Sequence, residues 1–207
     1  DVISDAAAKE VSLYAEALKH GFDLATKNHM LTLNHVVEIQ KRLEQNDAGI
    51  RKIPGTVLVN PASGAIIYTA PQEYQTILRL MDNLMAYINN QEMHDVDPLI
   101  KMAVIHYQFE TIHPFYDGNG RTGRIINLLY LVMEGLLTLP VLYLSRYIIR
   151  NKGEYYRQLQ SVRDTDEWEP WILYMLEAVE QTSQQTILLV NGIKDLMMDY
   201  KHRIRSG

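Results

Sequence analysis

Residues 112–124 read I-H-P-F-Y-D-G-N-G-R-T-G-R and separate two apolar segments of the chain. The segment before them, 99–112, is apolar on most sides, and so is the segment after them, 125–133. Helices that are apolar nearly all round belong in the centre of a helical bundle. The stretch therefore predicts a short turn between two buried helices.

Most of the remaining chain repeats apolar residues every three or four positions, the spacing of one helix face. One segment differs: residues 56–69, T-V-L-V-N-P-A-S-G-A-I-I-Y-T, carry two β-branched runs around an Asn-Pro-Ala-Ser-Gly turn, which predicts a β-hairpin. An isolated two-stranded hairpin is only marginally stable in water, so we expect it to pack against the helices. We expect a mostly α fold with one small hairpin, in a single domain over residues 1–207.

Composition narrows the classes of function. The chain has 207 residues, a formal net charge of −5 and no cysteine. No basic stripe stands out, which disfavours a nucleic-acid-binding surface, and no apolar run reaches the roughly 18 residues of a membrane span. The lack of cysteine excludes disulfides, thiolate metal sites and a cysteine nucleophile. We expect a cytoplasmic protein with neither nucleic acid nor membrane as partner.

The run G-N-G-R-T-G at 118–123 fits the dinucleotide-binding pattern G-x-G-x-x-G only in its letters. That motif requires a preceding strand and an acidic residue about 20 positions later. The chain before the run reads as helix, and no Asp or Glu lies between Glu134 and Glu154. A dinucleotide fold is therefore disfavoured, and so is a protein kinase, since no H-R-D run follows.

The residues themselves predict an anion site. Gly118 and Gly120 can take positive φ and expose successive backbone N–H groups. A helix that begins near Arg121 adds its N-terminal dipole. Arg121 and Arg124 in that first turn oppose the dipole, which favours a polyphosphate between them. Asp117 supplies the hard oxygen ligand of a Mg²⁺ ion held mainly by substrate phosphates.

His113 stands before Pro114, which disfavours helix at the preceding residue. The imidazole is therefore expected at a helix end beside the glycine loop. An unperturbed histidine titrates at about pH 6.5, which suits a general base at neutral pH.

Residues 113–124, H-P-F-Y-D-G-N-G-R-T-G-R, resemble the signature of Fic domains, H-P-F-x-D/E-G-N-G-R-x-x-R, at every fixed position. The resemblance extends to the hairpin upstream and to K-G-E-Y-Y-R-Q-L at 152–159, and covers most of residues 6–190. It implies a helical bundle with a small β-hairpin flap. It also implies transfer of AMP from ATP to a Ser, Thr or Tyr hydroxyl of a target protein, with release of pyrophosphate.

The resemblance also implies roles for single residues. His113 takes the proton of the target hydroxyl, and Asp117 holds Mg²⁺ against the α- and β-phosphates. Arg121 binds the β-phosphate, and Arg124 binds the γ-phosphate. Phe115 points into the core. The anion hole is formed by Gly118, Asn119 and Gly120.

Two further regions take roles from the resemblance. The adenine pocket is lined by Tyr155, Tyr156, Leu159 and Arg163. The hairpin is the flap that aligns an extended segment of an unknown protein target by main-chain pairing, with Thr56, Val57 and Leu58 as its active edge. Self-modification and a homodimer are both left open.

Variants within the family refine the expectation. Relatives that transfer a terminal phosphate carry lysine where this chain has Gly120, which favours AMP. The inhibitory helix motif S/T-x-x-x-E-G/N is absent, since the only Glu before Gly or Asn is Glu134, and position 130 is Tyr. We expect the core of a longer, self-inhibited protein, without the inhibitory helix or a C-terminal winged-helix module.

Other interpretations stay open at this point. His106, Glu110 and His113 share a helix face and include one Glu-x-x-His pair, but a di-iron bundle needs a second, so His106 and Glu110 are expected to pack behind the loop. Residues 117–120 could be a surface turn, and the tyrosine pair at 155–156 could be core. The function could also be an ATP-binding regulatory module without turnover, transfer of another phosphate-containing group, or removal of AMP.

Overall fold

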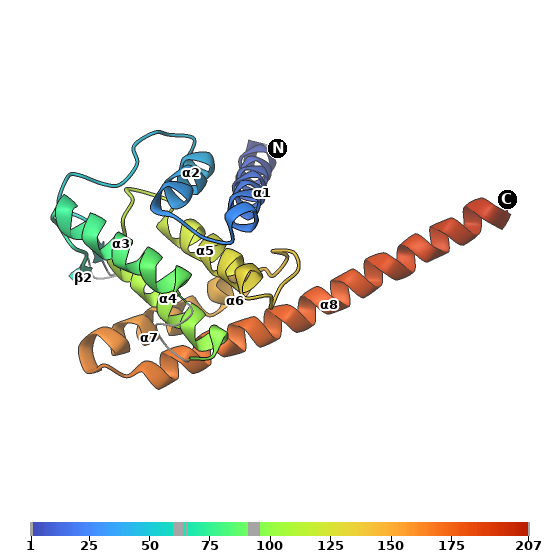
Figure 1. The fold of residues 1–207 in the computed structure, drawn as a ribbon. Coiled ribbons are helices and arrows are strands. Elements are labelled where there is room, and N and C mark those ends of the chain that lie inside the picture. Colours follow the sequence, from blue (N-terminus) through green and yellow to red (C-terminus); the bar gives the residue numbers. More distant parts are fainter. Residues whose placement is uncertain (1, 60–63, 65, 91–95, 207) are drawn as a thin grey trace. The chain divides into compact units, whose positions relative to one another are not determined.

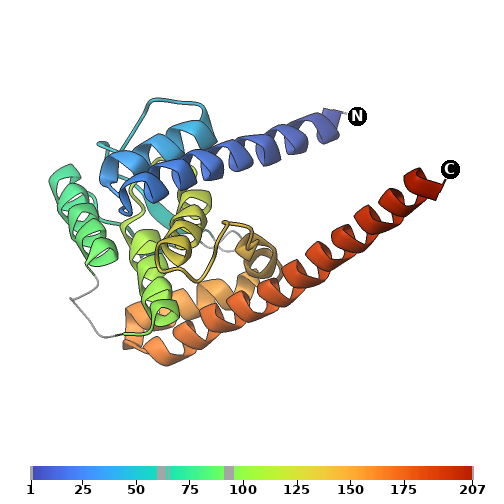
Figure 2. The same cartoon turned by 45° about the vertical axis from the view of Figure 1, so that its right-hand side comes forward.

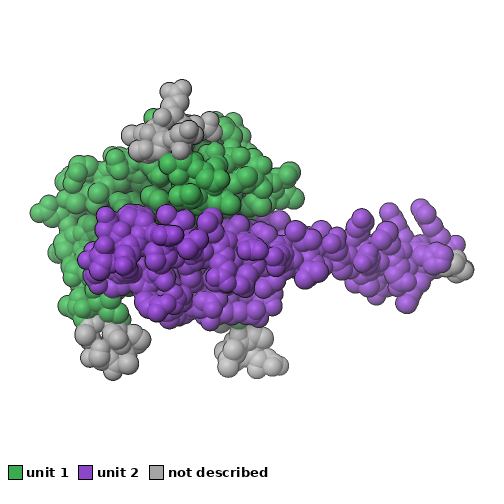
Figure 3. Space-filling model, turned by 90° about the horizontal axis from the view of Figure 1, so that it is seen from below, with its two compact units in different colours: residues 1–140 green, residues 141–207 purple. Residues whose placement is uncertain are grey.

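A computed structural model of the protein describes residues 2–59, 64, 66–90 and 96–206. Over that part of the chain it has eight α-helices and one two-stranded antiparallel sheet (Figure 1). The mostly α fold with a small hairpin is thereby confirmed. The chain divides into two compact units, Asp1–Pro140 and Val141–Gly207 (Figure 3). The single domain over the whole chain stays a prediction.

The first unit is built around two central helices. Helices α4 (Pro98–Ile112) and α5 (Asn119–Met133) pack against each other. Helices α1 (Val2–Asn28) and α2 (Leu33–Glu44) run side by side and lie against α5, while α3 (Tyr74–Asn89) packs on α4 (Figure 2). This arrangement confirms the turn between two buried helices.

Local sequence explains both central helices. Asp97 caps α4 by accepting a hydrogen bond from the Leu99 N–H at 2.8 Å, and Pro98 takes the first helical position. Each fully buried aliphatic or aromatic side chain contributes about 1.5–3 kcal/mol. The core positions of the two helices include Met102, Ile105, Phe109, Ile112, Ile125, Ile126, Leu129 and Leu131.

Helix α2 brings two polar side chains to the loop between α4 and α5. It begins with a capping box in which Thr32 Oγ1 accepts from the His35 N–H at 3.2 Å and His35 Nδ1 accepts from the Thr32 N–H at 3.4 Å. Gln40 and Glu44, one turn apart on this helix, then reach the loop.

The hairpin consists of β1 (Val57–Val59) and β2 (Ile66–Thr69), paired antiparallel with Val57 opposite Thr69 and Leu58 opposite Tyr68. Residues 60–63 and 65, which include most of the expected turn, lie outside the described residues. Val57 and Leu58 are in β1, whereas Thr56 precedes it and its carbonyl accepts from Gln72 Nε2 at 3.1 Å. The hairpin's base is therefore held by side chains of the same unit.

The second unit contains α6 (Leu144–Arg150), α7 (Lys152–Thr165) and α8 (Trp168–Ser206). Its core is aromatic: the Trp171 and Tyr174 rings stack with centroids 6.1 Å apart, and Tyr147 lies 5.3 Å from Tyr174. Every residue from 187 to 205 on α8 is exposed. None of the helices in the described parts of the chain combines the length and the hydropathy needed to cross a membrane.

Candidate active site

Two residues with a left-handed backbone conformation flank the loop between the central helices. His113 follows α4 with φ 48° and ψ 60°, and Gly118 precedes α5 with φ 80°. The positive φ expected at Gly118 is confirmed. A Cβ on Gly118 would also collide with the Glu44 carboxylate. Glycine therefore suits this position through its backbone conformation, and any Cβ there would require the Glu44 carboxylate to move.

Gly120 needs its missing side chain for a different reason. It lies inside α5 with a helical backbone, so the positive φ expected there is wrong, whereas the helix begins at Asn119, two residues before Arg121 and close to the expected start. A Cβ on Gly120 would lie 3.2 Å from Arg124 Nη1. The bare backbone lets the Arg124 guanidinium lie against the first turn of α5.

The Asn119 side chain forms two hydrogen bonds with the loop backbone. Its Oδ1 accepts from the Phe115 N–H and its Nδ2 donates to the Phe115 carbonyl, both at 2.9 Å. Phe115 is fully buried, with its ring 6.4 Å from that of Phe109. The Asn119 side chain is therefore engaged within the protein, while the residue itself is one of those that line the hollow described below.

His113 lies at the rim with its Nδ1 turned toward α4. This nitrogen is 3.4 Å from the Glu110 carbonyl oxygen and 4.0 Å from Glu110 Oε2. Glu110 is nearly buried and His106 fully so, as expected for polar packing partners behind the loop. Burial, followed by the charge of Arg124, lowers the pKa of His106 to about 3, so that side chain is neutral near pH 7.

Asp117 is fixed at the same rim. Its Oδ1 accepts from the Gly118 N–H at 2.7 Å, and its carbonyl accepts from Gln40 Nε2 at 3.2 Å. Asp117 is exposed to solvent. An anchored, exposed carboxylate can supply one oxygen ligand to a hard cation.

Arg121 is paired with two carboxylates that the sequence analysis did not identify. Its Nη2 lies 2.7 Å from Glu44 Oε1 and its Nη1 lies 3.0 Å from Glu10 Oε1. Burial raises the pKa of the Glu44 carboxyl even though the Arg121 charge lowers it. No local signal could reveal these pairs, because they join residues 77 and 111 positions apart.

These groups surround one hollow of about 290 Å³. The hollow combines an imidazole, a carboxylate, two guanidinium groups and the N-terminal amides of α5, which is the composition of a polyphosphate site with a base at its edge. Its lining residues are His113, Tyr116, Asp117, Gly118, Asn119, Gly120, Arg121 and Arg124.

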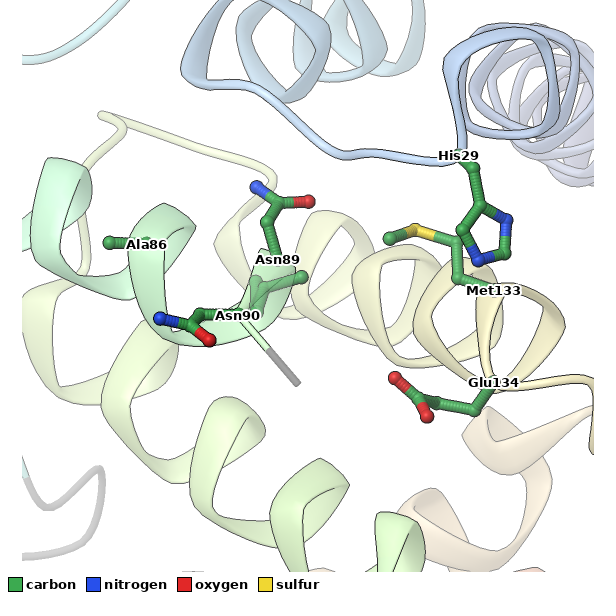
Figure 4. Close-up of a pocket in the computed structure, with 7 residues that line it drawn as sticks. His29, Ala86, Asn89, Asn90, Met133 and Glu134 are labelled. Carbon is green, nitrogen blue, oxygen red and sulfur yellow. The ribbon is translucent and has the colours of Figure 1, made fainter. Parts of the chain in front are cut away.

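A larger cavity of about 560 Å³ in the same unit lacks this chemistry. Figure 4 shows His29, Met133 and Glu134 on one side of it and Asn89 and Asn90 on the other. Its lining contains no lysine or arginine. A polyphosphate would find no permanent positive charge there, so the smaller hollow is the candidate active site.

The four residues expected around adenine lie on α7, in the second unit. Leu159 is buried, and so is Tyr155, whose ring centroid lies 5.8 Å from Trp171 and 6.2 Å from Tyr174. Tyr156 is exposed, and Arg163 Nη1 donates to Gln160 Oε1 at 3.4 Å. Tyr155 thus belongs to the aromatic core of its unit, and the role of all four residues at a nucleotide stays a prediction.

Comparisons with known proteins identify relatives of this chain. Residues 30–131 match the family model of the Fic/DOC family. The chain is 28% identical over 170 residues to protein adenylyltransferase fic-1 of Caenorhabditis briggsae, covering 79% of this chain and 30% of that relative. It is 25% identical over 167 residues to protein adenylyltransferase Fic of Aedes aegypti, covering 77% and 30%. The chain therefore spans about a third of the length of these curated relatives.

A solved structure shows the same fold. The crystal structure of a Fic family protein from Desulfovibrio desulfuricans G20 matches with a TM-score of 0.72 and 23% identity, over 87% of this chain and 53% of that chain. At this identity the likeness concerns the fold alone.

Proposed function

This chain is a Fic domain protein, and we propose that it transfers AMP from ATP to a Ser, Thr or Tyr hydroxyl of a target protein, releasing pyrophosphate. Relatives named protein adenylyltransferase, at 25–28% identity, support the proposal. The main observation behind the proposal is that His113, Arg121 and Arg124 line one hollow at the first turn of α5.

The charges of the hollow suit a nucleoside triphosphate. The first amides of α5 have no intrahelical acceptor and present a partial positive charge. Arg121 and Arg124 add two cations in the same turn. The helix dipole disfavours cations at this end. Glu44 and Glu10 offset the charge of Arg121 in the free protein, and an anion of high charge can engage both guanidinium groups together with the free amides.

His113 is the proposed general base. Its Nδ1 faces the Glu110 carbonyl, which makes Nε2 the nitrogen to approach a target hydroxyl. The proton of that hydroxyl passes to Nε2 while its oxygen forms a bond to the α-phosphorus of ATP. The bond from the α-phosphorus to the oxygen that bridges to the β-phosphate breaks, and pyrophosphate leaves with the electron pair. Arg121 and Arg124 would stabilise the charge on that leaving group.

Mg²⁺ is the cofactor that the family implies, and the rim of the hollow fits it through Asp117. The Asp117 carboxylate is exposed and anchored by the Gly118 N–H. Within the described parts of the chain, no three His, Cys, Asp or Glu side chains are placed to hold a metal. The ion would therefore take its other ligands from phosphate oxygens and water, and bound there it would neutralise phosphate charge.

Two further parts complete the proposal. Tyr155, Tyr156, Leu159 and Arg163 would line the adenine pocket. An extended segment of the target protein would pair with the edge formed by Thr56, Val57 and Leu58, since β1 has β2 as its only hydrogen-bonded neighbour among the described strands.

Incubation with Mg²⁺ and ATP labelled at the α-phosphate tests the proposal. We expect label on protein, with the mass increase of AMP in an intact-mass spectrum, and loss of both in His113→Ala. Self-modification makes the test independent of a known target. ATP binding without any label, on the chain itself or on a cell extract, would favour a regulatory module instead, and a different mass increase would indicate another transferred group.

A further inference from the structure

The end of α4 that carries His113 is capped by two side chains, one from β2 of the hairpin and one from the segment that precedes β1. The last carbonyl groups of a helix lack an intrahelical donor. The Thr111 carbonyl accepts from Tyr68 Oη of β2 at 2.9 Å, and the Ile112 carbonyl accepts from Arg51 Nη2 at 3.3 Å. The His113 carbonyl accepts from Arg51 Nε at 2.7 Å. Three successive carbonyls around the proposed base are therefore held from one side.

Arg51 also joins the two roots of the hairpin. It precedes β1, and its Nη2 donates to the carbonyl of Pro71, which follows β2. Its backbone N–H donates to the Pro114 carbonyl at 2.9 Å. One residue thus connects both legs of the hairpin to the backbone of His113 and Pro114.

The environment of Arg51 suits arginine better than lysine. The residue is fully buried, and the hydrogen bonds that its guanidinium donates within the described residues all go to backbone carbonyl oxygens. A cation at the C-terminus of α4 interacts favourably with the helix dipole. Lysine could supply the charge, but it lacks the planar fork that serves three carbonyls at once.

His113 needs such support. Its left-handed backbone is uncommon for a residue with a Cβ, and Pro114 further restricts it. A residue in a sparsely populated conformation persists only where its surroundings determine it. The two hydrogen bonds of Arg51 to the His113 and Pro114 carbonyls fall directly on this strained turn.

We propose that Arg51 is a positioning residue that holds the His113 backbone in its left-handed conformation and fixes it to the roots of the hairpin. The base and the target-docking edge then keep a constant distance and orientation. This inference rests on the proposed function, because it assigns His113 and the hairpin the roles given above.

Arg51→Lys and Tyr68→Phe test the inference, with the exposed Arg79→Lys on α3 as matched control. For Arg51→Lys we expect kcat of AMP transfer to fall about 10- to 100-fold, since a misplacement of 1 Å has an effect of that order. The Kd for ATP should change less than about twofold, because Arg51 does not line the hollow. Tyr68→Phe should lower kcat by a smaller factor, and Arg79→Lys should leave it unchanged.

Hydrogen exchange followed by mass spectrometry provides a readout that does not depend on catalysis. In Arg51→Lys, the backbone amides of residues 112, 113 and 115–118 should exchange faster, while those of α5 keep their protection. A folded Arg51→Lys protein with wild-type kcat, unchanged exchange at 112–118, or equal loosening throughout the unit would overturn the inference. If the wild-type chain transfers nothing, the proposed function fails, and the exchange experiment still decides whether Arg51 holds the turn.

Discussion

Arg121 on α5 forms an ion pair with Glu44 on α2, with Nη2 2.7 Å from Oε1. The pair compensates a cation placed where the helix dipole disfavours it. Glu10 contacts the same guanidinium, but its side chain is 62% exposed against 11% for Glu44. Solvent screens an exposed pair far more than a buried one. Glu44 is therefore the carboxylate that sets the charge available to a phosphate at Arg121.

Glu44→Gln should strengthen the binding of nucleotides with a β-phosphate. The neutral amide leaves the full charge of Arg121 for the ligand, so we expect ATP and ADP to bind about 3- to 10-fold more tightly, measured by isothermal titration calorimetry. AMP should bind as it does to the wild type. Glu10→Gln is the control, with an expected change below about twofold. Weaker ATP binding in Glu44→Gln would contradict the assignment.

Gly118→Ala should destabilise the protein more than Gly135→Ala does. Both glycines have positive φ, +80° and +73°, and for alanine that conformation costs about 1 kcal/mol. Nothing lies within 4 Å of a Cβ on Gly135, whereas one on Gly118 would collide with Glu44. We expect a loss of about 2–3 kcal/mol for Gly118→Ala in denaturant unfolding. Equal losses for the two variants would show that Glu44 moves aside freely.

Asn119→Ala should loosen the loop. The change removes both hydrogen bonds to the Phe115 backbone and leaves a buried N–H and C=O without their partner. We expect a loss of about 1–3 kcal/mol in unfolding free energy and faster hydrogen exchange of the Phe115 amide. Asn46→Ala, at an exposed turn where Oδ1 accepts from Ala48, is the control and should cost less than about 0.5 kcal/mol. An unchanged exchange rate of the Phe115 amide would show that the two hydrogen bonds of Asn119 do not hold the loop.

His106 should make stability depend on pH. Its pKa falls from 6.5 in the unfolded chain to about 3 in the folded protein, mainly through burial. The unfolded state therefore binds more protons between these values, so stability is full above about pH 6.5 and is lost as the pH falls toward 3. We expect a loss of roughly 3 kcal/mol between pH 7 and pH 4 from this group.

His106→Gln isolates that contribution. Its unfolding free energy should fall less between pH 7 and pH 4 than that of the wild type, whatever its absolute stability, because carboxylates titrate alike in both proteins. Parallel pH profiles of the two proteins would show that His106 is protonated without cost.

The sequence by itself determined the centre of the fold and the contents of the loop. Asp97 and Pro98 begin α4, the apolar segments are buried, and Gly118 takes positive φ. Each of these follows from interactions within a few residues of the chain. Gly120 shows the limit of such reasoning: a glycine can turn or stay helical, and its contact with Arg124 depends on the helix that forms.

Only the tertiary structure decided how the loop is held and how its charges are paired. The partners of Arg121 come from α1 and α2, the His113 backbone is fixed by Arg51, and the Asn119 amide is occupied by Phe115. In the sequence, Glu44 and Arg51 resemble any surface charges. Whether a charge is buried and what it meets depends on helices brought together by the whole core, and no local pattern encodes that encounter.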